Sequence, residues 1–251
     1  MDVDRHAGAG HPGGNASPGA TSGPRHFTRF SLFQRLQHIA LLVSFLLLTI
    51  TGLPMRFPDV AWLGAVYQLI GGLPVARVVH RVAAGVMILD GLVHLGYLAV
   101  LLVQNRGRVF EAWPMIPNGK DARDWWETSK YYFGLRATLP PYDRFSFREK
   151  FDYFAVFWGL PVMMFSGLVL WFPVWFGNRL PDLAIGIAYI AHSDEAILAI
   201  AAIIVWHFYN VHYNPDKFPM NWVWWTGTLS EEEIRKEHPL EYERLVGKSG
   251  R

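Results

Sequence analysis

Four long apolar stretches alternate with polar segments along this chain of 251 residues. Each stretch holds about 20 or more predominantly apolar residues with two charges at most, which is enough to cross the hydrocarbon core of a bilayer as an α-helix. The later stretches lie too far from the N-terminus to be signal peptides. The pattern therefore predicts an all-α fold, an integral membrane four-helix bundle with helices at residues 33–56, 77–104, 150–176 and 184–212.

The polar segments divide the chain into three regions. Residues 1–28 are rich in Gly, Pro, Ala and Ser, a composition typical of a disordered tail. Residues 29–215 form the predicted membrane domain, with a long inner loop at 105–149, and residues 216–251 form a C-terminal tail. Within the loop, Asp124–Phe133 suits a helix at the lipid headgroups, where Trp and Tyr are enriched, and equally an ordinary surface helix.

Composition and charge support this interpretation. Hydrophobic residues make up 51% of the chain and charged residues 18%, proportions that favour a membrane protein over a soluble domain. Lys and Arg concentrate before the first helix, in the long loop and in the C-terminal tail, so the positive-inside rule predicts that both termini are cytoplasmic. A net charge of +2 gives no indication of nucleic-acid binding.

The chain contains no cysteine. This excludes thiolate-bound iron–sulfur clusters, c-type haem attachment through C-x-x-C-H and disulfides within the chain. Any such redox centre must belong to a partner subunit.

Six histidines lie in or at the ends of the apolar stretches. An imidazole within the membrane is costly unless it is paired or binds a metal, and two imidazoles from two helices can hold one haem iron between them. The spacings of 14 residues from His80 to His94 and 15 from His192 to His207 each amount to about 21 to 22 Å along a helix, so they predict haems at two depths. The six histidines are His38, His80, His94, His192, His207 and His212.

The predicted orientation sorts these histidines by depth. His80 and His192 fall at the outer level and form the first predicted pair. At the inner level His207 can pair with either His38 or His94. Because this level holds more imidazoles than one haem needs, the chain binds either two haems or three, the third involving His212.

His94 has an alternative role. Asp90 lies four residues before it on the same helix face, where a carboxylate can hydrogen-bond the imidazole. If His94 binds iron, Asp90 fixes its tautomer. If it does not, the two residues form part of a proton path to a quinone.

Two helix ends resemble each other. Thr51–Pro58 has the sequence TGLPMRFP and Ser166–Pro173 has the sequence SGLVLWFP. Glycine lets neighbouring helices approach closely, so either packing needs alone or an internal duplication explains the likeness.

Motifs around the histidines are similar to those of a known family. The chain resembles the cytochrome b (gamma) subunit of membrane formate dehydrogenases, within the wider family of di-haem cytochromes b of nickel–iron hydrogenases and thiosulfate reductases. The likeness extends from about Arg29 to Leu245. The motifs are Arg35-Leu-Gln-His38, Thr51-Gly52, Phe57-Pro58, Val79-His80, Lys150, Gly167 to Pro173, Ile190-Ala-His192, His207-Phe-Tyr209 and Glu237-His238-Pro239 followed by Tyr242.

The resemblance implies two b haems, the outer one held by His80 and His192 and the inner one by His38 and His207. Two features depart from it: the family spacing on the fourth helix is 14 rather than 15, and His94 has no counterpart. The spacings of 14 and 15 are instead similar to the four-histidine pattern of the cytochrome b of quinol:cytochrome complexes, which would pair His94 with His207.

The resemblance also implies a quinone, as mobile substrate, beside the inner haem at the start of the third helix. Arg148, Lys150 and Asp152 lie there, although the two cations suit simple anchoring of the helix equally well. The expected function is electron transfer between the quinone pool and a periplasmic partner subunit that carries iron–sulfur clusters or c-type haems, in the bacterial cytoplasmic (inner) membrane. The alternative is a haem-free transporter or anchor subunit whose histidines relay protons.

Overall fold

The computed structural model describes residues 25–215 and 217–249. Within this part of the chain, four helices are long and apolar enough to cross a membrane, which confirms the predicted all-α membrane bundle. The fourth span changes character near its end, where an α-helix continues as two π-helical segments. The spans are α1 (Leu32–Arg56), α3 (Gly72–Gln104), α6 (Phe147–Trp171) and α8 (Leu183–Ala201) with η1 (Ala202–His207) and η2 (Tyr209–Tyr213).

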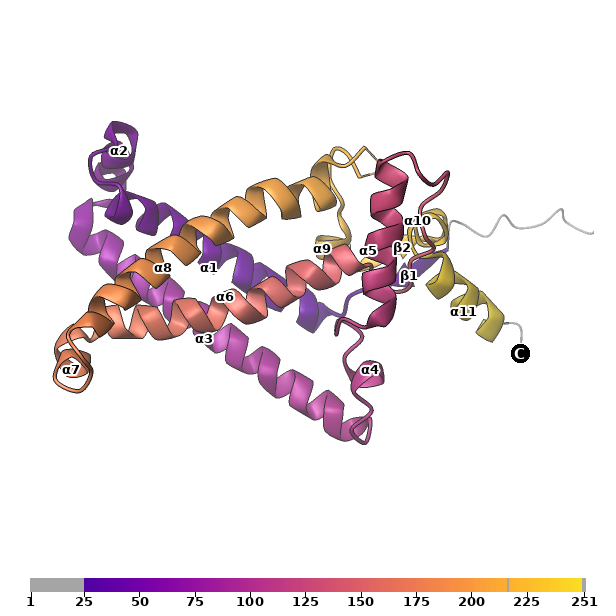
Figure 1. Ribbon diagram of the computed structural model, residues 1–251, viewed down its shortest axis with the longest axis horizontal. Coiled ribbons are helices and arrows are strands. Elements are labelled where there is room, and N and C mark those ends of the chain that lie inside the picture. The colour runs from indigo at the N-terminus through magenta and orange to yellow at the C-terminus, as the bar shows by residue number, and fades with distance from the viewer. Residues whose placement is uncertain (1–24, 216, 250–251) are drawn as a thin grey trace, which may run out of the picture.

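The long helices pack as two antiparallel hairpins, α1 with α3 and α6 with α8. The hairpins cross each other, with contacts between α3 and α6 and between α1 and α8 (Figure 1). Large apolar side chains point outward, among them Val82 (62% exposed) and Val205 (72% exposed), as expected for helices that meet lipid. Buried positions are instead small or hydroxyl-bearing, such as Ala83, Thr51 and Ser166, which allows close helix packing.

Shorter elements cover the two ends of the bundle (Figure 1). We call one end the α2–α7 end, because α2 (Ala61–Ile70) and α7 (Pro173–Gly177) lie there. The other is the sheet end, which holds the segments before α1, between α3 and α6, and after η2. Its elements are β1 (His26–Thr28), α4 (Val109–Ala112), α5 (Gly119–Tyr132), α9 (Val223–Thr226), β2 (Thr228–Ser230), α10 (Glu231–Glu237) and α11 (Pro239–Ser249).

Helix boundaries follow local signals that hydrophobicity alone does not reveal. Ser146 caps the N-terminus of α6 in a reciprocal capping box with Glu149, so the helix begins at Phe147 and not at 150. It ends at Trp171 and not at 176, because the chain bends there and Pro173 begins α7. The left-handed Gly71 (φ 101°) ends α2, which lets α3 begin at Gly72 rather than at 77.

The predicted inner loop contains a helix across the sheet end. In Figure 1, α5 lies across the long helices. Its Asp121, Asp124 and Thr128 are buried, whereas Trp125 and Trp126 are each 55% exposed. The helix therefore has a polar face toward the protein and an aromatic face directed outward.

The chain segments on either side of the bundle form one small layer at the sheet end. Residues 1–24 of the predicted disordered tail lie outside the described residues, but the last residues of that prediction form β1, which pairs antiparallel with β2. Phe27 lies opposite Leu229 and packs on a core of Leu229, Val223 and Ile234. β1 is stabilised by pairing with a strand some 200 residues away, and the local sequence does not predict this pairing.

A buried ion network joins this layer to the bundle. The Arg29 guanidinium lies 2.9 Å from a carboxylate oxygen of Glu149 on α6 and 2.9 Å from one of Glu241 on α11. Arg144 donates to Glu241 at 2.5 Å and to the Arg29 carbonyl at 2.8 Å. Both Arg29 and Glu241 are buried, so each charge depends on its partners.

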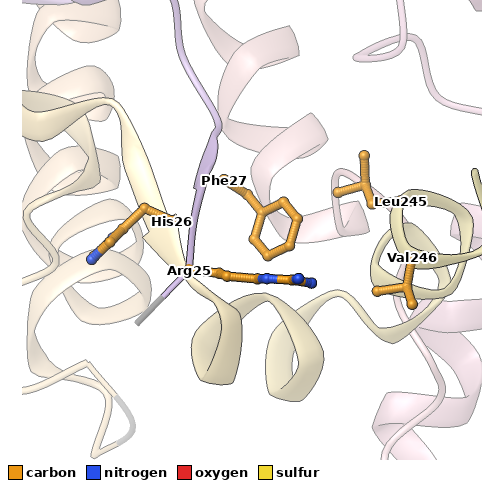
Figure 2. A pocket seen from close by; sticks show the side chains of 5 residues that line it. All are labelled: Arg25, His26, Phe27, Leu245 and Val246. Atoms are coloured by element: carbon orange, nitrogen blue, oxygen red, sulfur yellow. The ribbon is translucent and has the colours of Figure 1, made fainter. Parts of the chain in front are cut away.

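A depression of about 290 Å³ opens on the same layer. In Figure 2, Phe27 points toward Leu245 and Val246, the Arg25 side chain lies beside it and His26 points away. None of the six intramembrane histidines lines this depression.

We predict that Arg29→Met destabilises the fold. The substitution leaves Glu149 and Glu241 without the buried cation between them, so we expect unfolding in detergent to require about 3 kcal/mol less. The control is Arg108→Met, since Arg108 and Glu111 form an ion pair with both side chains more than half exposed, and a change within about 0.5 kcal/mol is expected there. Equal effects of the two substitutions would contradict the structural role of the network.

We also predict that acid weakens this layer through His238. Its Nδ1–H donates to the Asp143 carbonyl at 2.7 Å, and burial, together with the nearby Arg29 cation, lowers the pKa of the imidazole. The unfolded chain then binds the proton more readily, so the stability present above the ordinary histidine pKa of about 6.5 is lost as the pH falls below that value. Thermal melts between about pH 7 and about pH 5 should show this loss, and it should be smaller in His238→Gln but unchanged in His26→Gln, which alters an exposed histidine of the same layer.

Candidate functional site

Two imidazoles face each other across the hairpins near the α2–α7 end. The ring centres of His80 on α3 and His192 on α8 lie 6.3 Å apart, with an angle of 63° between the ring planes. A metal ion between two imidazoles needs ring nitrogens about 4 Å apart, since each bond is about 2 Å, and this places the ring centres about 6 Å apart. The separation of these rings therefore suits one metal ion with two axial imidazoles.

Hydroxyl groups fix the tautomer of both imidazoles. The Thr51 hydroxyl lies 2.9 Å from His80 Nδ1 and donates to the Leu47 carbonyl at 2.6 Å. Because its own hydrogen is already used, the hydroxyl accepts the hydrogen of Nδ1. Nδ1 then carries the proton and Nε2 keeps a free lone pair, the form that binds a metal.

The second hairpin repeats this arrangement. The Ser166 hydroxyl lies 3.1 Å from His192 Nδ1 and donates to the Val162 carbonyl at 2.5 Å. Both imidazoles are therefore held through Nδ1 by a hydroxyl on the other helix of their own hairpin.

Glycines beside the hydroxyls make room for the rings. A Cβ atom at Gly52 would lie 3.3 Å from His80 Cε1, and one at Gly167 would lie 3.1 Å from His192 Cε1. Thr51–Pro58 and Ser166–Pro173 thus share a role: each provides a hydroxyl and a gap for one imidazole. Sequence reasoning missed these supporting residues, although the repeated hydroxyl–glycine pair was the signal that could have found them.

Three further histidines gather near the sheet end. The Nδ1 atom of His207 lies 3.1 Å from a carboxylate oxygen of Asp152 on α6. His38 on α1 lies within electrostatic range of both His207 and His212. The Nδ1 atoms of His38 and His212 are buried without a hydrogen-bond partner.

The π-helical turns accommodate the unusual spacing on the fourth helix. Hydrogen bonds in a π-helix join residues five apart instead of four, so a π-helical turn contains more residues than an α-helical turn. A π segment can therefore include one extra residue while the chain completes the same rotation about the helix axis. η1 begins at Ala202, between His192 and His207. The two histidines, 15 residues apart, therefore point in about the same relative directions as two residues 14 apart on a regular α-helix. The wider turns of η1 and η2 also bring His212, five residues after His207, toward the same side of the helix as His207.

His94 has both ring nitrogens occupied by other side chains. Nδ1 lies 3.1 Å from Gln37 Oε1, and Nε2 lies 2.7 Å from the Tyr153 hydroxyl. These contacts take the place of the expected hydrogen bond to Asp90. The structure therefore leaves neither nitrogen of His94 free for iron.

The residues expected at a quinone site each have a partner in the protein. Lys150 is buried and its Nζ lies 2.9 Å from Asp121 on α5. Arg148 lies over the Tyr142 ring, 5.5 Å from its centre. Asp152 contacts His207, so of the three it is the one that the structure brings to the histidines.

A metal ion at these sites would need ligands from outside the chain. Among residues 25–215 and 217–249, no group of three or more His, Cys, Asp or Glu side chains is placed to hold a metal ion. Two axial imidazoles suffice when a macrocycle provides the remaining ligand nitrogens, as haem does. The His80–His192 pair, with both Nδ1 atoms engaged, fits a haem better than a bare ion.

Comparisons with known proteins agree with this chemistry. A family described as prokaryotic cytochrome b561 matches residues 29–217, which include all four membrane spans. No curated protein matches the chain.

We predict that removal of either supporting hydroxyl weakens haem binding. Thr51→Val and Ser166→Ala each remove the hydroxyl that accepts from an imidazole Nδ1, and loss of such a partner lowers metal affinity by about 10- to 100-fold. Haem content per chain after detergent washing measures the loss. The control is Ser44→Ala, because Ser44 is equally buried on α1 and donates to the Ala40 carbonyl at 2.7 Å but contacts no imidazole. Equal haem loss in the control would show that the hydroxyls act through packing alone.

Proposed function

This chain belongs to the prokaryotic cytochrome b561 family, so it is a multi-pass membrane cytochrome b that binds haem b for electron transfer, and from this premise we propose the route that the electrons take. The chain carries electrons between a periplasmic redox partner and the quinone pool through bis-histidine b haems near the two membrane faces. It serves as the cytochrome b subunit of a quinone-linked oxidoreductase of the formate dehydrogenase type.

The observation that carries this proposal is the facing pair of His80 and His192. Haem b supplies reversible one-electron chemistry when it is bound. His80 and His192 would hold this haem, the hydroxyls of Thr51 and Ser166 orient their rings, and the apolar helices exclude water. Family membership argues against the alternative of a haem-free protein that relays protons.

At the sheet end we propose His38 and His207 as the second pair. His207 is oriented through Nδ1 by Asp152, and His38 lies on the neighbouring hairpin, within electrostatic range of it. The hydrogen bonds of His94 to Gln37 and Tyr153 weigh against it as the partner of His207. A third haem would require His212, and the haem count below decides between two and three.

The distribution of charge supports an orientation. The basic segments before α1, between α3 and α6 and after η2 all lie at the sheet end, so we propose that this end faces the cytoplasm. The α2–α7 end then faces the periplasm, where a partner with iron–sulfur clusters or c-type haems would dock. The exposed Trp125 and Trp126 of α5 suit lipid headgroups at the cytoplasmic face of a bacterial inner membrane.

We place the quinone near the start of α6, beside the sheet-end pair. Asp152 supports this location because it lies against His207. Lys150 and Arg148 contribute through structure, since their contacts to Asp121 and Tyr142 also hold α5 and the loop against α6. Reduction of a quinone requires protons as well as electrons, and the cytoplasmic boundary supplies them.

We predict that the purified chain shows the α-band of bis-imidazole b haem in a reduced-minus-oxidised spectrum, with two haems per chain. His80→Leu should remove one haem and His38→Leu the other, because each deletes one axial ligand. His94→Leu and His212→Leu should retain both. Absence of the α-band in the wild type would refute the electron-transfer proposal. Haem loss in the His94 variant would instead assign the second pair of ligands to His94 and His207.

A further inference from the structure

We propose that Asp152 sets the redox potential of the sheet-end haem by hydrogen-bonding its ligand His207. The inference rests on the proposed function, because it requires His207 to bind haem iron. The Asp152 carboxylate lies 3.1 Å from His207 Nδ1, so Nε2 would be the nitrogen left to bind the iron. Each of the two side chains is about one quarter exposed, so the contact is partly shielded from water.

The proposed ligands differ in what their Nδ1 atoms meet. His80 and His192 bond to the neutral hydroxyls of Thr51 and Ser166. The Nδ1 atom of His38 is buried without a hydrogen-bond partner. Of these four imidazoles, His207 is the one for which the described residues provide a carboxylate.

The Asp152 carboxylate interacts with the His207 imidazole and not with the neighbouring lysine. Lys150, two residues earlier on α6, is buried against Asp121 and so is engaged elsewhere. The Nδ1–H group of His207 donates to the Asp152 carboxylate, a charge-assisted hydrogen bond that is stronger than one to a neutral hydroxyl.

A carboxylate in this position changes the ligand itself. It draws the Nδ1 proton toward itself and makes the imidazole more basic at Nε2. A more basic axial ligand favours ferric over ferrous iron, so the potential of this haem falls. Asp152 is therefore a positioning residue that acts on iron through His207, and the hydroxyls at the other level lack this effect.

The test is a redox titration of the haem α-band in the purified full-length protein. Asp152→Asn removes the charge but keeps an acceptor oxygen near His207, so we expect one titration component to move to higher potential while the other stays in place. Asp152→Glu, which restores the charge, should keep the shifted component closer to its wild-type potential. The low-spin ferric signal of the same haem should change in electron paramagnetic resonance, reporting the altered imidazole.

Asp182→Asn is the matched control, because it makes the same chemical change at an exposed aspartate before α8, at the opposite end of the bundle. Unchanged potentials in Asp152→Asn, or an equal shift in Asp182→Asn, would overturn the inference while leaving the haem ligands as proposed. Loss of one haem in both the Asn and Glu variants of Asp152 would also overturn it, because the residue would then be needed for binding alone. A wild-type chain without haem would instead reject the proposed function.

Discussion

An imidazole buried among apolar helices is stabilised by partners for its ring nitrogens, and this interaction organises much of the membrane interior of the protein. Water cannot satisfy these atoms there, so each nitrogen left without a hydrogen bond or a ligand is costly. The Nδ1 atoms of His80, His192 and His207 bond to Thr51, Ser166 and Asp152 respectively. Their Nε2 atoms therefore keep a free lone pair.

Division into two hairpins makes this arrangement possible. Each hairpin is closely packed and supplies both an imidazole and its supporting hydroxyl, so the tautomer is set by contacts within each hairpin. The facing pair of imidazoles forms only across the hairpins, between α3 and α8. At the sheet end, the ion network around Arg29 ties the segments that flank the bundle to α6, the helix that carries Asp152.

Particular residues show what the local sequence could predict and what it could not. The pairing of His80 with His192 followed from helix length and the direction of each span, because a helix converts residue spacing into depth. The role of Thr51-Gly52 and Ser166-Gly167 did not follow, since a hydroxyl and a glycine are also common helix-packing residues. His94 was ambiguous for a similar reason: its spacing suits a ligand, but Gln37 and Tyr153 come from other helices and occupy both nitrogens.

The sequence by itself determined the four membrane helices, their approximate ends and the position of each histidine along its helix, because hydrophobicity and helical rise are properties of consecutive residues. It also determined that a haem iron cannot be held by a thiolate of this chain, since the chain has no cysteine. Only the tertiary structure decided which nitrogen of each imidazole is free, how the π turns re-align His207, and that β1 pairs with β2. Those outcomes depend on side chains and strands far apart along the chain, whose contacts arise only when the hairpins and the sheet end are assembled.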